Sequence, residues 1–422
     1  MLTAGARRYA MLILAVVYMF NFIDRQILAI LLPAIRDEFQ VGDTVLGLLT
    51  GTAFALFYVT LGIPIAQVAD RWNRRNLVAA ALAIWSGMTA LSGLAANIWQ
   101  LTLARIGVGI GEAGCSPPAH SMISDYYPPE QRSIAMGFYT LGISTGIMIA
   151  YLAGGWVVEN HGWRQAFFIV GIPGLILAGI MRFTVVEPQR GASEERVASG
   201  SRPTFLEVLQ FLRGRRSFIH MGVAAGLSSF VGYAVVNFFP SYVVRSFGMG
   251  LAELGFWLGI IVGIAGGVGY FGGGVIADKL GRESRRKSFN FLALASLVSM
   301  LFYVTVFLAQ SSGWALAMLV LPTGLANLYL ATVLAQAQSL VSLRMRAVAS
   351  ALVLLLINII GLACGPLFTG MLSDALEPSF GAESIRYSLL IVCVLILPWA
   401  AWHYVLAGRS IDADLGRARE QD

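Results

Sequence analysis

Charged side chains are scarce in this chain: Asp, Glu, Lys and Arg together make up 12% of its 422 residues. A soluble protein carries roughly 25%. Hydrophobic residues account for 57%, so there is too little charge to cover a surface in water. The composition excludes an ordinary soluble domain and indicates a membrane protein.

Cysteines and catalytic motifs are also few. Cys115, Cys364 and Cys393 lie in apolar stretches without metal or redox spacing, so we expect neither a disulfide nor a metal site. HExxH, GxSxG and phosphate-loop signatures are missing, as is a nucleotide-binding domain, and we therefore expect no cofactor, no enzyme activity and no ATP-driven pump. A G-x-G-x-x-G pattern at 109–114 lies inside an apolar stretch without the strand that a dinucleotide site requires.

Long apolar runs fill most of the sequence. A helix needs about 20 apolar residues to cross a bilayer. Twelve such stretches are predicted, at about 10–32, 46–68, 77–94, 101–123, 134–157, 166–185, 218–243, 256–277, 289–308, 314–335, 348–372 and 389–405. The sequence therefore predicts an all-α membrane protein with twelve transmembrane helices.

Lys and Arg are concentrated in alternate loops. They cluster near residues 7–8, 71–75, 213–216, 279–287 and 344–346, and they are rare in the opposite set of loops. Basic loops face the cytoplasm, so we expect both termini inside and the chain in the inner membrane. The net charge of +6 is accounted for by these loops, and we expect no nucleic acid partner.

The two halves of the chain repeat. AQVADRWNRR around Asp70 matches GVIADKLGR around Asp278, at an offset of 208 residues (278 − 70). We predict an N-terminal bundle of six helices at 1–186, a linker at 187–216, a C-terminal bundle of six helices at 217–408 and a cytoplasmic tail at 409–422. Within the linker, the spacing of Phe205, Leu206, Leu209 and Leu212 favours an amphipathic helix on the membrane surface over a solvated linker helix.

These repeated loops resemble the signature of the major facilitator superfamily. Gly274, Asp278, Lys279, Gly281 and Arg282 fit it fully, and Asp70, Arg71, Arg74 and Arg75 form a second copy in which Ala66 and Asn73 replace glycines. DRQILAILLP and RIGVGIGEAGCSPPAHSMISDYYPPEQR look like the Spinster branch, in a bacterial form. The resemblance implies two pseudo-symmetric six-helix bundles, secondary transport of lysolipids or sphingolipids by alternating access, and a monomer.

Four charged residues lie deep inside the apolar stretches: Asp24, Arg25, Arg105 and Glu112. A charge at bilayer depth costs several kcal/mol unless it faces a polar cavity or a partner. Arg105 and Glu112 are seven residues apart and so share one helix face. We predict proton coupling at Glu112 and Asp24 with Arg105 as modulator; the alternative is a static ion pair. Arg25 either contacts the substrate headgroup or pairs with Asp24 or Asn21.

The second half carries no Asp, Glu, Lys or Arg inside its apolar stretches. If the cavity lies between the halves, one wall is charged and the other apolar, which favours an amphiphilic substrate. We expect substrate contacts from Arg25, Arg105 and Glu112 and from Phe230, Tyr233 and Asn358, although aromatic residues at helical spacing also serve as packing. The alternatives are an organic-anion carrier, a multidrug exporter, a membrane enzyme and a sensor. The lack of catalytic constellations and of a soluble domain disfavours the last two.

The signature loops predict a cytoplasmic gate. Each aspartate ends a helix beside basic residues, an arrangement that can hold the two halves together by ion pairs and helix dipoles. The predicted set is Asp70, Arg71, Arg74, Arg75, Asp278, Lys279 and Arg282, with Arg132 and Arg346 at the start of the fifth span of each half. The alternative is that these basic residues only determine topology.

Overall fold

The computed structural model describes residues 3–191, 205–342 and 344–419. Within these ranges, the side chains at 63, 66, 67, 69, 70, 129, 133, 270, 274, 277, 278, 282, 418 and 419 are not described. The described residues form helices joined by short loops. The α-helices are α1 Ala4–Phe39, α2 Asp43–Gly47, α3 Ala53–Arg71, α4 Arg74–Ser92, α5 Ile98–Glu112, α6 Ser116–Tyr126, α7 Pro129–His161, α8 Trp163–Thr184, α9 Phe205–Arg213, α10 Arg216–Phe247, α11 Leu251–Ile260, α12 Gly266–Glu283, α13 Arg285–Phe307, α14 Ser312–Leu325, α15 Tyr329–Ser339, α16 Arg346–Leu356, α17 Cys364–Phe380 and α18 Ser384–Arg419.

Each of the twelve predicted spans falls on helix in the described chain, and the fourth and tenth each cover two helices separated by a turn. Nine helical runs in this part are long and apolar enough to cross a membrane by length and composition alone. Spans two, eight and eleven each contain a π-helical segment, which are η1 Leu48–Thr52, η2 Ile261–Ala265 and η3 Ile357–Ala363. A short 3₁₀ helix, η4 Gly381–Glu383, precedes α18. The prediction of an all-helical membrane protein is confirmed.

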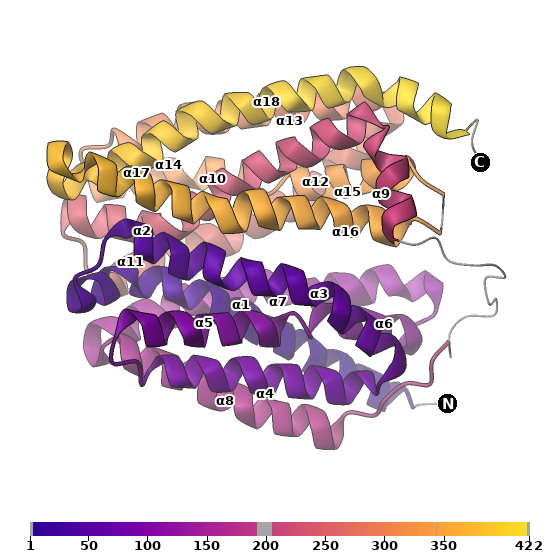
Figure 1. Ribbon diagram of the computed structural model, residues 1–422, viewed down its shortest axis with the longest axis horizontal. Helices are drawn as coiled ribbons and strands as arrows, with labels where there is room; N and C mark the ends of the chain where they lie inside the picture. Colours follow the sequence, from indigo (N-terminus) through magenta and orange to yellow (C-terminus); the bar gives the residue numbers. More distant parts are fainter. Residues whose placement is uncertain (1–2, 192–204, 343, 420–422) are drawn as a thin grey trace. The chain divides into compact units, whose positions relative to one another are not determined.

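Unit 1 consists of residues 1–41, 48–199 and 249–259. In it, α1 packs along α7, and α4 packs against α5 and α8 (Figure 1). Glycines on α7 allow the close approach to α1: a side chain at Gly142 would meet the carbonyl oxygen of Ala15 at 2.9 Å, and one at Gly146 would meet that of Met19 at 2.5 Å. Such contacts between small residues and a neighbouring backbone are typical of packed membrane helices.

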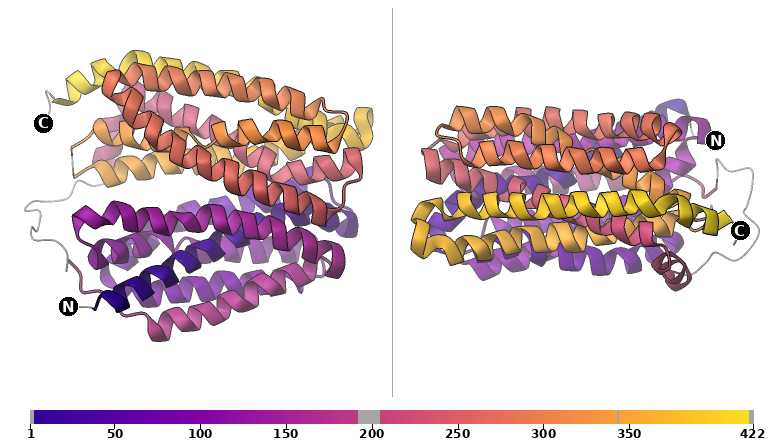
Figure 2. Two further views of the ribbon diagram at one scale, coloured as in Figure 1. Left: turned by 180° about the vertical axis from the view of Figure 1, so that it is seen from behind. Right: turned by 90° about the horizontal axis from the view of Figure 1, so that it is seen from above.

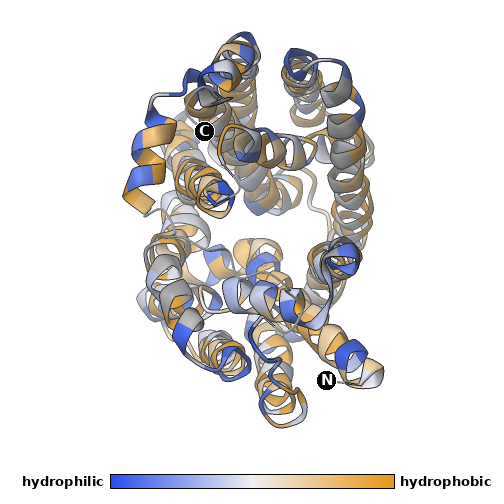
Figure 3. Ribbon diagram, turned by 90° about the vertical axis from the view of Figure 1, so that its right-hand side faces the viewer, coloured by the Kyte–Doolittle hydropathy of each residue, from blue (hydrophilic) through white to orange (hydrophobic). Residues whose placement is uncertain are grey.

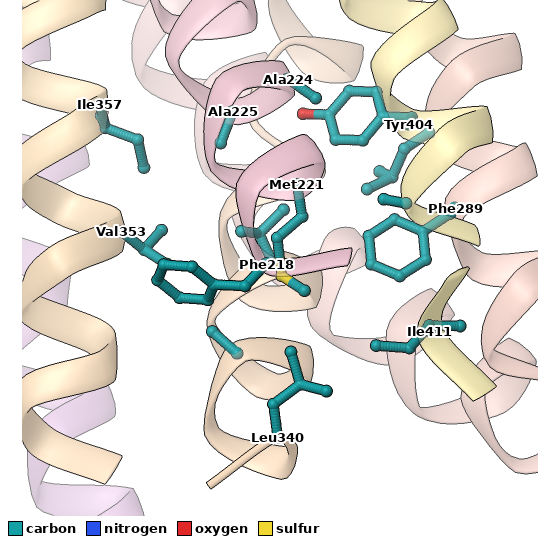
Figure 4. Packing of buried hydrophobic residues seen from close by; sticks show 14 of the residues in the cluster. Phe218, Met221, Ala224, Ala225, Phe289, Leu340, Val353, Ile357, Tyr404 and Ile411 are labelled. Atoms are coloured by element: carbon teal, nitrogen blue, oxygen red, sulfur yellow. The ribbon is translucent and has the colours of Figure 1, made fainter. Parts of the chain in front are cut away.

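Unit 2 consists of residues 42–47, 200–248 and 260–422. Its helix α18 packs along α10 and α13, and the pair α13 and α18 lies side by side in both views of Figure 2. The core of unit 2 gathers around Phe218 and Met221 of α10, Val353 of α16, and Phe289 of α13, all buried (Figure 4). Hydrocarbon side chains therefore fill the space between these helices.

The short helix α9 belongs to the same core. Val208 and Leu212 are fully buried in it, whereas Leu206 and Leu209 are 58% and 38% exposed. One face of α9 thus holds it to unit 2, and the other presents apolar side chains outward. Figure 3 shows hydrophilic residues at many of the helix ends that face the viewer, and hydrophobic residues along the helices behind them.

The fourth and tenth spans share a break. Helix α5 ends at Glu112 and α6 begins at Ser116, while α14 ends at Leu325 and α15 begins at Tyr329. Both breaks are turns of three residues, and they lie 213 residues apart (325 − 112). The internal repeat seen in the sequence is therefore also present in the backbone.

Candidate functional site

Three of the four charged residues that the sequence places deep in the apolar stretches are fully buried. Asp24 on α1 is 0% exposed, Glu112 at the end of α5 is 1% exposed and Arg105 on α5 is 2% exposed. The side chain of Arg25 is 18% exposed. All four belong to unit 1, so the structure brings together the charged residues that the sequence singled out.

Arg25 forms an ion pair with Glu112. Its Nε lies 2.5 Å from Oε2 of Glu112, which joins α1 to the end of α5. The sequence left Arg25 open between a substrate contact and a pairing with Asp24 or Asn21; the ion pair that the structure gives is with Glu112. A buried ion pair is costly to desolvate, and removal of one partner leaves an uncompensated charge in the interior.

Aromatic rings surround the Arg25 guanidinium. Its carbon lies 4.5 Å from the ring centre of Tyr58, 4.9 Å from that of Phe54 and 5.5 Å from that of Phe22. Phe54 and Tyr58 come from α3, one helical turn apart. These cation–π contacts stabilise a partly desolvated cation and orient its plane towards Glu112.

Asp24 and Arg105 form the second part of the cluster. Thr89 of α4 donates a hydrogen bond to Oδ1 of Asp24, and Nη1 of Arg105 lies 3.4 Å from the carbonyl oxygen of Asp24. Within the described part of the chain, Arg105 is within 4 Å of neither carboxylate, although it is buried beside both. Its predicted role as modulator stays a prediction.

Several polar atoms of the cluster have no hydrogen-bond partner. With both carboxyl groups ionised, the charges of Asp24, Glu112, Arg25 and Arg105 sum to zero. Oδ2 of Asp24, Oε1 of Glu112 and Nε of Arg105 are buried without a hydrogen-bond partner among the described residues. Because unpaired polar atoms are costly in an interior, these oxygens can accept a proton or a polar group of a substrate.

The break after Glu112 was not predicted. The sequence suggested one continuous span at 101–123, but α5 ends at Glu112 and the chain turns before α6. The signal was present, since Pro117 and Pro118 occupy the first turn of α6, where proline is favoured. The break places a carboxylate at a helix end inside the membrane-spanning part of unit 1.

The three residues predicted for the second half lie in unit 2. Phe230 of α10 is buried and its ring centre lies 5.9 Å from that of Phe368. Tyr233 is one turn further along α10, and Asn358 of η3 donates to the carbonyl oxygen of Leu354. Nearby, Ser228 and Tyr404 share a hydrogen bond of 3.1 Å. Hydroxyl and amide groups are thus present among the apolar side chains in this part of unit 2.

Arg74 of the first signature loop is buried in unit 1. Its Nε lies 2.8 Å from Oε1 of Glu187, and Nη1 donates to Ser121 and to Asp125. Burial alone lowers the pKa of Arg74, but the hydrogen bonds and charges of Asp125 and Glu187 outweigh it and raise that pKa above its ordinary value. Nε of Arg132 lies 3.2 Å from the carbonyl oxygen of Ser124.

The remaining gate residues are only partly described. The side chains of Asp70, Asp278 and Arg282 lie outside the described residues. Arg71, Lys279 and Arg346 are exposed, and the backbone N–H of Arg75 lies 2.7 Å from Oε2 of Glu187. The cytoplasmic gate therefore stays a prediction.

A buried ion pair of unit 2 was missed by the sequence analysis. In unit 2, Arg245 binds both carboxylate oxygens of Asp43 at 2.7 and 2.5 Å, and Ser373 donates to the same group at 2.7 Å. Asp374 accepts the backbone N–H groups of Asp43 and Thr44 at 2.7 and 2.9 Å. Asp43 lies just before the predicted second span, and a charged residue in a loop gives no signal of a buried ion pair.

Comparison with known proteins agrees with this architecture. A bacterial homologue of the human lysosomal transporter Spinster, solved in an inward-facing and unoccupied conformation, is 32% identical with a TM-score of 0.90, over 98% of this chain and 99% of that one. The structure of an inward-facing, occupied conformation has a TM-score of 0.86 at 31% identity, over 98% of this chain and 99% of that one.

Curated relatives point the same way. An MFS-type efflux pump of Mycolicibacterium smegmatis is 31% identical over 94% of this chain and 92% of its own length. Protein spinster homolog 1 of Homo sapiens is 27% identical over 99% of this chain and 84% of its own. The Major Facilitator Superfamily model matches residues 14–363. The chain belongs to the Major Facilitator Superfamily, as a Spinster-like secondary transporter rather than an enzyme.

Proposed function

We propose that this transporter moves a lipid-like amphiphile of the lysolipid or sphingolipid type across the inner membrane by alternating access, coupled to protons. The protein works as a monomer with both termini in the cytoplasm. Asp24 and Glu112 bind the protons, and Arg105 adjusts their affinity. Asp70, Asp278 and the basic residues of the signature loops form the cytoplasmic gate.

The buried pair of Arg25 and Glu112 carries this proposal. A proton on Glu112 removes the negative charge that holds Arg25, and the cluster changes from neutral to a net charge of +1. Arg25 keeps its charge, because a guanidinium does not lose its proton at physiological pH. It is then free to bind an anionic headgroup in place of Glu112. Proton binding and substrate binding are thereby linked at one cation.

The substrate class follows from the difference between the units. Unit 1 carries a charged cluster, whereas the buried charged residues in the described part of unit 2, Asp43, Arg215 and Asp414, all lie near helix ends. A molecule with a polar head and an apolar tail suits a protein in which one unit holds its buried charges in the middle of the spans and the other holds them near helix ends. Phe230, Tyr233 and Asn358 are the proposed contacts for the tail.

A second candidate is a proton-coupled efflux pump for hydrophobic drugs. The resemblance to the mycobacterial efflux pump favours it, because that relative covers nearly the whole chain. In this case, Glu112 and Asp24 would bind a cationic drug directly. An organic-anion carrier, gripping its substrate with Arg25 and Arg105, is the remaining alternative of the same fold.

A transport assay with purified protein in liposomes tests the proposal. We expect labelled lysolipid to move faster when a pH gradient is imposed, and the Glu112→Gln variant to lose this acceleration. Glu253→Gln, the same change at an exposed position on α11, is the matched control and keeps it. Equal rates with and without the gradient in the wild type would remove proton coupling from the proposal.

A competition panel separates the candidate substrates. Lysolipids, organic phosphates and cationic dyes are added in turn to the same liposomes. Inhibition by lysolipids alone supports the proposed substrate, inhibition by dyes supports the efflux pump, and inhibition by organic phosphates supports the anion carrier.

A further inference from the structure

Unit 1 contains an apolar cavity of about 130 Å³ between α1, α7 and α8. Phe20, Ile23 and Ile27 of α1 line one side, and Gly154 of α7 and Ala166 and Val170 of α8 line the others. Every side chain that lines it is a hydrocarbon or glycine, so it offers no hydrogen bond to water. An apolar cavity of this order stays dry and takes up apolar guests.

The cavity opens on the outer surface of unit 1. Ala153 of α7 and Ile169 of α8 line it and are exposed, Ile169 by 51%. Trp156 and Ile172 on the same helices are also exposed, by 55% and 50%. Both α7 and α8 are long and apolar enough to cross a membrane. The opening between Ala153 and Ile169, called the mouth below, therefore faces the hydrocarbon of the bilayer.

Polar and aromatic residues mark one end of the cavity. Trp163 and Arg164 begin α8, three and two residues before Ala166. Nε1 of Trp163 lies 2.7 Å from Oε2 of Glu38, and Nη1 of Arg164 lies 2.6 Å from the same oxygen. Tryptophan and charged residues of this kind lie at the level of lipid headgroups. The cavity therefore begins within one helical turn of the interface, at the depth of the first methylene groups of a lipid.

We propose that this cavity is a binding site for an acyl chain of a bilayer phospholipid. The chain enters between Ala153 and Ile169 and packs against Ile23 and Ile27. Ile23 and Ile27 flank Asp24 and Arg25 in the sequence of α1, one on each side, so the bound chain packs against the helix that carries part of the charged cluster. The bound chain supports α1 against α7 and α8. This proposal is independent of the substrate that the protein transports.

Photo-crosslinking tests the site. The full-length protein is placed in vesicles of phosphatidylethanolamine that carry a diazirine on one acyl chain, illuminated, digested and mapped by mass spectrometry. We expect the label to be concentrated on residues 149–157 and 166–170. Ala153→Leu fills the mouth and lowers this labelling about tenfold, the factor expected when roughly two methylene groups lose their buried place. Ala80→Leu, at an exposed position of α4, is the matched control and leaves the labelling unchanged.

A second variant and a second probe complete the test. Ile169→Ala widens the mouth and raises the labelling, so the proposal stays testable even if Ala153→Leu does not fold. Labelling spread evenly over Ile172 and Ile176, and unaffected by either change, would show ordinary lipid contact only and overturn the site. A diazirine lysolipid that labels the cavity while phosphatidylethanolamine does not would also overturn it, since the occupant would then be the transported molecule.

Discussion

At the scale of single residues, Arg25 is defined by what surrounds its guanidinium. The centres of three aromatic rings lie within 5.5 Å of the guanidinium carbon, and Nε donates a hydrogen bond to Glu112. A guanidinium is planar and weakly hydrated, so it is stabilised by ring faces in a way that a compact ammonium is not. The position therefore requires arginine rather than any cation.

Arg25→Gln is expected to destabilise the protein by about 3 kcal/mol, because it leaves Glu112 buried without its cation. The double variant Arg25→Gln with Glu112→Gln is expected to recover most of this loss. Thermal unfolding of the purified variants measures both. Arg164→Gln breaks a half-exposed pair with Glu38 and serves as the control, with an expected loss of about 0–1 kcal/mol. Strictly additive losses in the double variant would contradict the pairing.

Sequence reasoning identified the four charged residues but not their partners. Charge inside an apolar stretch is a strong signal, because it is costly there. Thr89, Phe54 and Tyr58 carry no such signal, since threonine and aromatic residues are ordinary in membrane helices. Which carboxylate Arg25 reaches depends on the rotation of α1 relative to α5, and no pattern in the sequence fixes that rotation.

At the scale of elements, the start of α4 shows how a helix end is held. Asn73 accepts the N–H of Asn76 at 2.9 Å, and Glu187 accepts the N–H groups of Arg74 and Arg75 at 3.3 and 2.7 Å. A carboxylate at a helix N-terminus satisfies free N–H groups and interacts favourably with the dipole. The residues that follow α8 are thereby fixed to the beginning of α4.

Glu187→Gln is expected to weaken this helix start by about 1 kcal/mol, which corresponds to roughly fivefold faster amide exchange at Arg74 and Arg75. Hydrogen exchange followed by mass spectrometry reports it peptide by peptide. Asp412→Asn, at an exposed position of α18, is the control and leaves exchange in α4 unchanged. Unaltered exchange in Glu187→Gln would mean that Asn73 alone holds the end.

The elements were predicted better than their irregularities. The length of each apolar stretch was enough to place the spans, because the thickness of the bilayer determines how many apolar residues a spanning helix needs. The π-helical segments η1, η2 and η3 were not foreseen, since one additional residue in a turn leaves an apolar stretch apolar.

At the scale of the whole molecule, the resemblance of the repeated loops to the family's signature, together with the number of spans, was enough to predict the family fold. Both depend on features spread over the entire chain, so an error of a few residues at any span does not alter them. The proposed transport cycle depends on the protonation of a few atoms, which spans and repeats do not report, so it is tested by experiment.

Spin labels at Gln131 of unit 1 and Ala347 of unit 2, both exposed, test alternating access. We expect their distance distribution to shift between mildly acidic and mildly alkaline pH in the wild type. Glu112→Gln mimics the protonated acid, so it should hold the acidic distribution at both. Glu283→Gln, at an exposed position, is the control and should respond like the wild type. A pH response that survives in Glu112→Gln would assign proton sensing to another group.

The interrupted helices of spans four and ten also have a consequence for symmetry. The two equivalent breaks follow different residues: α5 ends at the acid Glu112, and α14 ends at Leu325, whose side chain is a hydrocarbon. In the proposed cycle, a proton binds at the end of α5, whereas the equivalent end of α14 carries no titratable side chain. Under that proposal, two halves that share one backbone pattern respond differently to pH at equivalent positions, which gives a symmetric fold a direction.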